Sequence, residues 1–231
     1  MTLILFDCDG TLVDSQNAIV SAMNAAFHAH GLKLAPRQSV IGVVGLSLVP
    51  AITRLLPRVD RDIVEQVAES YKRSFAEMRS QPEHDEPLFP GAREVLQGLA
   101  ARPGVRLGIA TGKSIRGVDA VIEREGWHGL FATIQTADDN PSKPHPGMVL
   151  RAMAEVDARP FETLMVGDTT FDVDMARAAG AHAIGVAWGY HDPRSLSDCG
   201  AHAMIERFDE LPATVDRLLC AVAAEPSGPI A

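Results

Sequence analysis

The chain has 231 residues, of which 46% are hydrophobic and 22% charged, and its net charge is -9. This composition is ordinary for a globular protein and provides enough residues for a large core. The acidic balance and the lack of a dense Lys/Arg block argue against a nucleic-acid-binding surface. The longest apolar stretch, residues 40–52, is too short to span a membrane.

Cysteine usage points to a reducing compartment. The chain has three cysteines, an odd number, and their spacing matches no metal-ligand pattern. No signal peptide is recognisable at the N-terminus, so we expect a cytoplasmic protein.

The first third of the chain predicts one strand followed by helices. Residues 3–6 form a short apolar run, typical of a buried parallel strand. Helical spacing then favours three helices, over residues 15–31, 48–55 and 60–78. Ser15 is a candidate cap for the first of them. The polar, proline-bounded residues 81–87 predict a linker.

Helices and strands alternate after this linker. Strands are expected at 105–110, 132–136, 163–166, 183–186 and 202–205, and helices at 92–101, 115–125, 147–156, 172–179 and 211–222. This alternation is typical of right-handed β-α-β units. We therefore predict an α/β fold with a Rossmann-like parallel sheet and helices on both of its faces. Residues 1–14 and 87–231 would form this core, and residues 15–86 would form a small all-helical cap inserted after the first strand.

Two carboxylates follow the first predicted strand. Asp7 and Asp9 flank Cys8 and precede Gly10 and Thr11. Because burying an unpaired carboxylate costs several kcal/mol, both are expected at the carboxyl end of the strand, where open α/β sheets bind ligands. An acidic turn would explain the same short pattern.

Two further polar clusters follow later strands. Thr111 and Gly112 come directly after the strand at 105–110, where a hydroxyl and backbone N–H groups can bind an anion. A plain helix cap is the alternative there. Lys143 lies in a loop with three prolines, and a stiff loop reduces the entropy lost when a lysine holds a phosphate. The alternative is a solvated surface lysine.

The fourth cluster is again acidic. Asp168 closely follows the strand at 163–166, and Asp172 lies four residues further, on the same side of a forming helical turn. Capping would also explain Asp172. Asp168 would repel Asp7 and Asp9 unless the three shared a cation, and clustered hard oxygen ligands suit Mg²⁺.

Taken in order, these clusters resemble the four motifs of the haloacid-dehalogenase-like (HAD) hydrolase superfamily. The segments that carry the resemblance are Asp7-Cys-Asp-Gly-Thr-Leu-Val-Asp-Ser15, Thr111, Lys143 and Gly167-Asp-Thr-Thr-Phe-Asp172. Residues 168–180 and 185–190 look most like the phosphoglycolate-phosphatase-like branch, which has a small helical cap where residues 15–86 lie. The resemblance implies a Mg²⁺-dependent phosphatase that acts on phosphoglycolate or another small phosphate monoester.

The resemblance also implies catalytic roles. Asp7 would be the nucleophile and form an aspartyl-phosphate. Asp9 would be the general acid and base, which requires a raised pKa. Thr111, Gly112 and Lys143 would bind the transferring phosphate.

A metal site and a cap loop follow from the same resemblance. Mg²⁺ is expected at the carboxylates of Asp7 and Asp168 and at the backbone carbonyl of Asp9, with Asp172 assisting. The cap would close over the site and exclude water. Residues 42–45, Gly-Val-Val-Gly, are a candidate substrate-facing loop, and a simple interhelical turn is the alternative.

Several alternatives stay open. A sugar phosphomutase shares all four motifs, and a non-catalytic regulatory or binding member is also conceivable. Asp9 argues against a dehalogenase, which lacks the second Asp. A phosphonatase needs a cap lysine, and Lys33 and Lys72 are the cap lysines.

The expected partner is a small phosphorylated metabolite, with no nucleic acid and no membrane, and the chain would be a monomer or a homodimer. Cys8, between two acids, raises the hypothesis of oxidation-sensitive activity.

Overall fold

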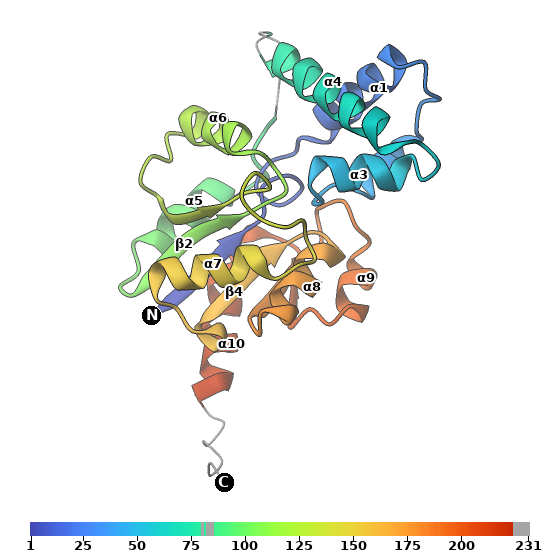
Figure 1. Cartoon of the computed structure of the whole chain (residues 1–231). Coiled ribbons are helices and arrows are strands. Elements are labelled where there is room, and N and C mark those ends of the chain that lie inside the picture. The colour runs from blue at the N-terminus through green and yellow to red at the C-terminus, as the bar shows by residue number, and fades with distance from the viewer. Residues whose placement is uncertain (80, 82–85, 224–231) are drawn as a thin grey trace.

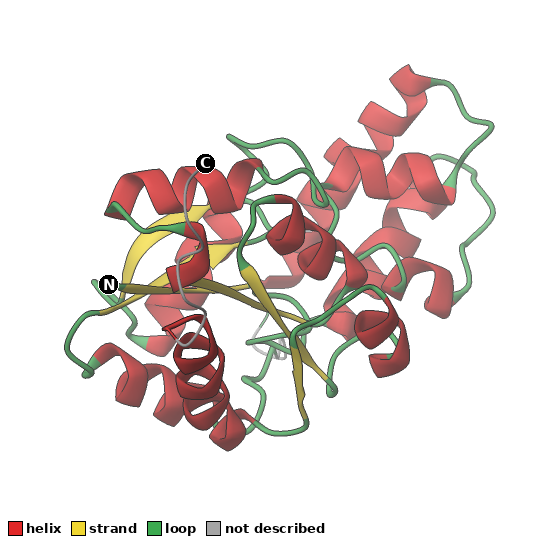
Figure 2. Cartoon of the chain, turned by 90° about the horizontal axis from the view of Figure 1, so that it is seen from below, coloured by secondary structure: helices red, strands yellow, loops and turns green. Residues whose placement is uncertain are grey.

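A parallel sheet forms the centre of the protein. The computed structural model describes residues 1–79, 81 and 86–223. The strand order is β3-β2-β1-β4-β5-β6, and all paired strands are parallel (Figures 1 and 2). The strands are β1 (Thr2–Phe6), β2 (Val105–Ala110), β3 (Phe131–Gln135), β4 (Thr163–Gly167), β5 (His182–Val186) and β6 (Ala203–Ile205). The predicted α/β fold is confirmed.

Helices cover both faces of the sheet. Ile4 and Phe6 of β1 pack into one apolar cluster, and Leu3 and Leu5 pack into another. The first cluster includes residues of α5 (Ala92–Ala100), α6 (Ile115–Glu125) and α10 (Leu211–Ala223). The second includes residues of α7 (Gly147–Val156), α8 (Thr170–Ala178) and α9 (Pro193–Asp198). This double cover explains why β1 is a continuous apolar run and not an alternating one.

The strand order creates a switch point beside β1. The chain passes from β1 to β2 and β3 on one side, and then crosses to β4 on the other side of β1. In open α/β sheets, ligands bind outside the carboxyl ends of the strands at such a point. The residues that directly follow β1 and β4 are therefore the first candidates for a site.

Four helices stand over the carboxyl ends of the strands (Figure 1). They are α1 (Gln16–Ala29), α2 (Arg37–Ile41), α3 (Leu48–Leu55) and α4 (Arg61–Arg79). Their buried apolar residues form a cluster separate from those of the sheet, which supports our proposal of a cap at residues 15–86. Residues 82–85 of the expected linker lie outside the described part. No helix of the described residues is long and apolar enough to cross a membrane.

Local hydrogen bonding explains where the structure departs from the predicted elements. The Ser15 side chain does not cap α1, because its hydroxyl donates to Asp9 instead. α8 begins two residues before the expected Asp172, since Thr169 and Asp172 form a reciprocal capping box. The short helices α2 and α9 were not predicted, because five and six residues are too few to show a helical period.

Truncation of a core side chain should destabilise the fold strongly. Leu5 is 0% exposed, whereas Leu34 in the cap is 50% exposed. We expect Leu5→Ala to lower the free energy of unfolding by about 2–5 kcal/mol, because it leaves a cavity. Leu34→Ala is the matched control, with an expected change within about 0.5 kcal/mol. Urea unfolding measures both, and equal losses would contradict the packing described here.

Candidate active site

The sheet brings the polar residues from distant parts of the sequence together. Asp7 directly follows β1, Thr111 follows β2, Lys143 lies in the loop after β3, and Asp168 follows β4. All four side chains are buried, as is Asp172 in the first turn of α8. Carboxylate oxygens of Asp7, Asp168 and Asp172, which we call the carboxylate cluster, lie within 4.8 Å of one another.

Lys143 neutralises part of this cluster. Its Nζ lies 2.6 Å from Asp172 Oδ1 and 3.0 Å from Asp7 Oδ2. Burial alone would lower the pKa of Lys143, but the carboxylates of Asp172 and Asp7 raise that pKa above its usual value. The lysine is therefore a fixed positive charge beneath the site and not a solvated surface residue.

Burial and mutual repulsion raise the pKa values of two carboxyl groups in the cluster. Burial, with the charges of Asp172 and Asp7, raises the pKa of Asp168 well above its usual range. Burial also raises the pKa of Asp7, to about 6, and Lys143 opposes this rise. The cluster thus holds more negative charge than Lys143 alone can balance, and it favours an additional cation.

Hydrogen bonds hold Asp168 in place. Its Oδ1 accepts from the Thr11 hydroxyl at 2.9 Å, and its Oδ2 accepts from the backbone N–H of Tyr190 at 2.9 Å. Gly10 packs against this carboxylate with a φ of +85°, and a side chain at position 10 would collide with it. The glycine after Asp9 is therefore required by the close approach of the segments that follow β1 and β4.

Asp9 has a different environment. Its Oδ1 accepts a hydrogen bond from Ser15 Oγ at 2.6 Å and one from Lys113 Nζ at 2.7 Å. Lys113 also lies 3.6 Å from Glu86, and its side chain is only 7% exposed. Lys113 is not among the site residues predicted from the sequence. Its position two residues after Thr111, next to a predicted strand end, was the available signal.

The cap contacts the core directly above these residues. A Cβ atom at Gly112 would lie 2.5 Å from the carbonyl oxygen of Gly45 and 2.7 Å from that of Leu46. The backbone N–H of Ser47 donates to Ser142 Oγ at 2.9 Å. Residues 42–45 therefore face the core, and Gly112 is a point of close contact between the cap loop and the loop after β2.

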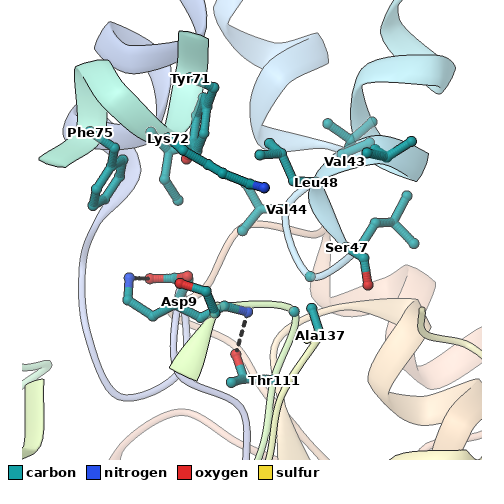
Figure 3. Close-up of a pocket in the computed structure, with 18 of the residues that line it drawn as sticks. Asp9, Val43, Val44, Ser47, Leu48, Tyr71, Lys72, Phe75, Thr111 and Ala137 are labelled. Atoms are coloured by element: carbon teal, nitrogen blue, oxygen red, sulfur yellow. Dashed lines mark hydrogen bonds and ion pairs between the residues drawn. The ribbon is translucent and has the colours of Figure 1, made fainter. Parts of the chain in front are cut away.

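A cavity of about 700 Å³ lies between the cap and the core. Asp9 and Thr111 line its core side, and Val44, Leu48 and Phe75 line its cap side (Figure 3). Asp7 also lines the cavity, so the cavity reaches the carboxylate cluster.

The cap lysines differ in position. Lys72 lines the cavity, whereas Lys33 does not belong to the described lining. The Lys72 ammonium donates to Glu69 Oε1 at 2.6 Å, and its side chain is 60% exposed. A Schiff-base lysine is activated by desolvation or by a nearby cation, so this environment does not favour phosphonatase chemistry.

Cys8 is inaccessible. Its side chain is 1% exposed, and burial, together with Asp9, raises the pKa of its thiol far above the usual range. Because the thiolate is the form that oxidants attack, this environment argues against the hypothesis of oxidation-sensitive activity through Cys8.

Several proteins named as phosphatases or hydrolases are similar to this chain in sequence or structure. The probable phosphatase IndB of Dickeya dadantii is 35% identical, with 94% of each chain covered. A phosphoglycolate phosphatase of Pseudomonas syringae is 30% identical over 85% of this chain and 73% of its own length. The crystal structure of a hydrolase from Pseudomonas syringae superposes with a TM-score of 0.82 at 26% identity, covering 94% of this chain and 99% of the other.

A family model gives the most general result. The model described as haloacid dehalogenase-like hydrolase matches residues 4–186, which include the carboxylate cluster, Thr111 and Lys143. The match spans the whole site and most of the sheet. The chain therefore belongs to the haloacid dehalogenase-like hydrolase family.

Proposed function

We propose that this protein is a Mg²⁺-dependent phosphatase that hydrolyses a small phosphate monoester through an aspartyl-phosphate. The observation that carries the proposal is the buried cluster of Asp7, Asp168 and Asp172 with Lys143, at the floor of a cavity that the cap covers. The names of the relatives from Dickeya dadantii and Pseudomonas syringae support phosphate ester chemistry.

In the first step, an oxygen of Asp7 attacks the phosphorus atom. One oxygen of Asp7 accepts the N–H of Cys8 at 2.7 Å, and this bond fixes the carboxylate. As the bond between phosphorus and the Asp7 oxygen forms, the ester bond breaks and the leaving oxygen takes a proton from Asp9. Lys143 and Thr111 orient and neutralise the phosphoryl oxygens.

In the second step, water hydrolyses the aspartyl-phosphate. Asp9, now ionised, takes a proton from the water, whose oxygen bonds to phosphorus while the bond to Asp7 breaks. The same residue thus acts first as acid and then as base. Ser15 and Lys113 hold one oxygen of Asp9 in position for both transfers.

The carboxylate cluster fits a divalent cation. Asp7 Oδ2 is buried and accepts no hydrogen bond from any described residue, although Lys143 Nζ lies 3.0 Å away. Hard carboxylate oxygens are the ligands that Mg²⁺ prefers. Asp7, Asp168 and Asp172 would hold the ion, with the backbone carbonyl of Asp9. When bound, Mg²⁺ would neutralise charge on the phosphoryl group.

A small phosphorylated metabolite in the cytoplasm is the partner that this proposal implies, and phosphoglycolate is the first ester to test. A sugar phosphomutase stays the second candidate, because it would use the same core residues. The two differ in product: a mutase isomerises a sugar phosphate faster than it releases phosphate.

Phosphate release should depend on both Mg²⁺ and Asp7. We expect Asp7→Asn to reduce release from a panel of small esters by about 10³-fold or more, because an amide cannot act as the nucleophile. Asp174→Asn, which changes an exposed carboxylate of α8, should keep wild-type rates. A phosphate assay with and without Mg²⁺ measures this. Release that survives Asp7→Asn would exclude Asp7 as the nucleophile.

Mg²⁺ should also stabilise the folded protein. At a concentration of about 100 times Kd, a ligand of the native state adds about 2.7 kcal/mol to the free energy of unfolding. We expect Asp168→Asn to remove most of this gain, and Asp119→Asn, an exposed carboxylate on α6, to preserve it. Thermal unfolding of each variant with and without Mg²⁺ gives the comparison. An equal gain in wild type and Asp168→Asn would mean that the ion binds elsewhere.

A further inference from the structure

We propose that the ester hydrolysed by this protein has a bulky, largely apolar leaving group, such as an alcohol that carries a ring, and not the two-carbon acid of phosphoglycolate. This inference rests on the phosphatase function proposed above and specifies the class of its substrate. The size and the wall of the cavity support it, and the charged residues of the lining are compatible with it.

The cavity is large for a two-carbon leaving group. Its volume of about 700 Å³ falls within the range of sites that enclose ligands of drug size, roughly 300–1,000 Å³. A phosphate at Asp7 and Thr111 with a glycolate attached would leave most of this space to water. A ring and its linker would fill the part that faces the cap.

Most side chains of the wall opposite the carboxylate cluster are apolar, although Tyr71 and Lys72 also lie on it (Figure 3). The apolar side chains include Ile19, Met23, Val40, Val44, Leu48 and Phe75. Ile19, Met23 and Val40 also belong to the core of the cap. Val44, Leu48 and Phe75 lie across the cavity from Asp9 and Thr111 (Figure 3). An apolar surface at this position gains free energy by burying an apolar leaving group.

Three of the four basic side chains in the described lining contact other residues, although the buried Nε of Arg79 has no hydrogen-bond partner among the described residues. Lys113 binds Asp9 and Glu86, and Lys72 binds Glu69. Arg79 stacks over the Phe75 ring, 5.1 Å from its centre, and donates to a backbone carbonyl. Arg116 is exposed. A leaving group without charge leaves the contacts of Lys113, Lys72 and Arg79 intact.

A matched pair of esters tests the proposal. Ethyl phosphate and 2-phenylethyl phosphate release alcohols of similar acidity, so their chemical steps are comparable and the ratio of their kcat/KM values reports binding of the ring. With saturating Mg²⁺, we expect this ratio to be about 10- to 100-fold in favour of the phenyl ester, given the free energy of burying one aromatic side chain. Phosphoglycolate is measured alongside and should resemble ethyl phosphate.

Substitutions in the cap test which residues bind the ring of the phenyl ester. Leu48→Asn places a polar side chain on the apolar wall and should lower the ratio about 5- to 20-fold. Leu34→Asn makes the same change on the cap outside the lining and should leave the ratio and the rates unchanged. Val44→Thr keeps the side-chain shape and should also lower the ratio. This variant replaces Leu48→Asn in the test if Leu48→Asn does not fold.

The outcomes separate this inference from the proposed function. A ratio near one, a preference for phosphoglycolate, or a ratio that Leu48→Asn and Val44→Thr both leave unchanged would overturn the inference while the protein remained a phosphatase. No phosphate release from any ester, with folded protein and bound Mg²⁺, would overturn the proposed function and this inference with it.

Discussion

The structure depends on how the repulsion among three buried carboxylates is balanced at the carboxyl ends of the strands. Asp7, Asp168 and Asp172 lie within reach of a single ion, and Lys143 contacts two of them. Removing one partner of a buried charge pair is strongly destabilising, because the other is left uncompensated. The fold accepts this cost at the switch point beside β1, where strands from both halves of the sheet end. In the proposed function, charge balance at this point would link the stability of the fold to the binding of a cation and of an anionic phosphate.

Much of this arrangement could be predicted from the sequence. An uninterrupted apolar run before Asp7 and another before Asp168 indicated buried parallel strands, and the carboxyl ends of parallel strands meet at one edge. The order of the polar clusters along the chain then indicated a shared site. The strand at 105–110 and the helices at 115–125 and 147–156 have the predicted bounds, because glycine or proline marks one end of each.

Other features depend on tertiary contacts that no local pattern encodes. Ser15 precedes a helix and has the side chain of a cap, yet its hydroxyl binds Asp9, which the turn after β1 brings close. Lys113 binds Asp9 across more than a hundred residues of sequence. The close contact between Gly45 and Gly112 joins the cap to the core, and the sequence does not show that these two glycines meet. Contacts of this kind decide the shape of the cavity, so the leaving group could not be inferred before the structure.

The proposed mechanism requires a covalent bond between Asp7 and phosphorus. Borohydride reduces an acyl phosphate to an alcohol, so it would convert a phosphorylated Asp7 side chain to that of homoserine. Mass spectrometry of the peptide that contains Asp7, after rapid quenching during turnover and reduction, detects this change. We expect homoserine at Asp7 in the presence of substrate and Mg²⁺, and none without substrate. An unmodified Asp7 during active turnover, or the modification at Asp9 or Asp168, would contradict it.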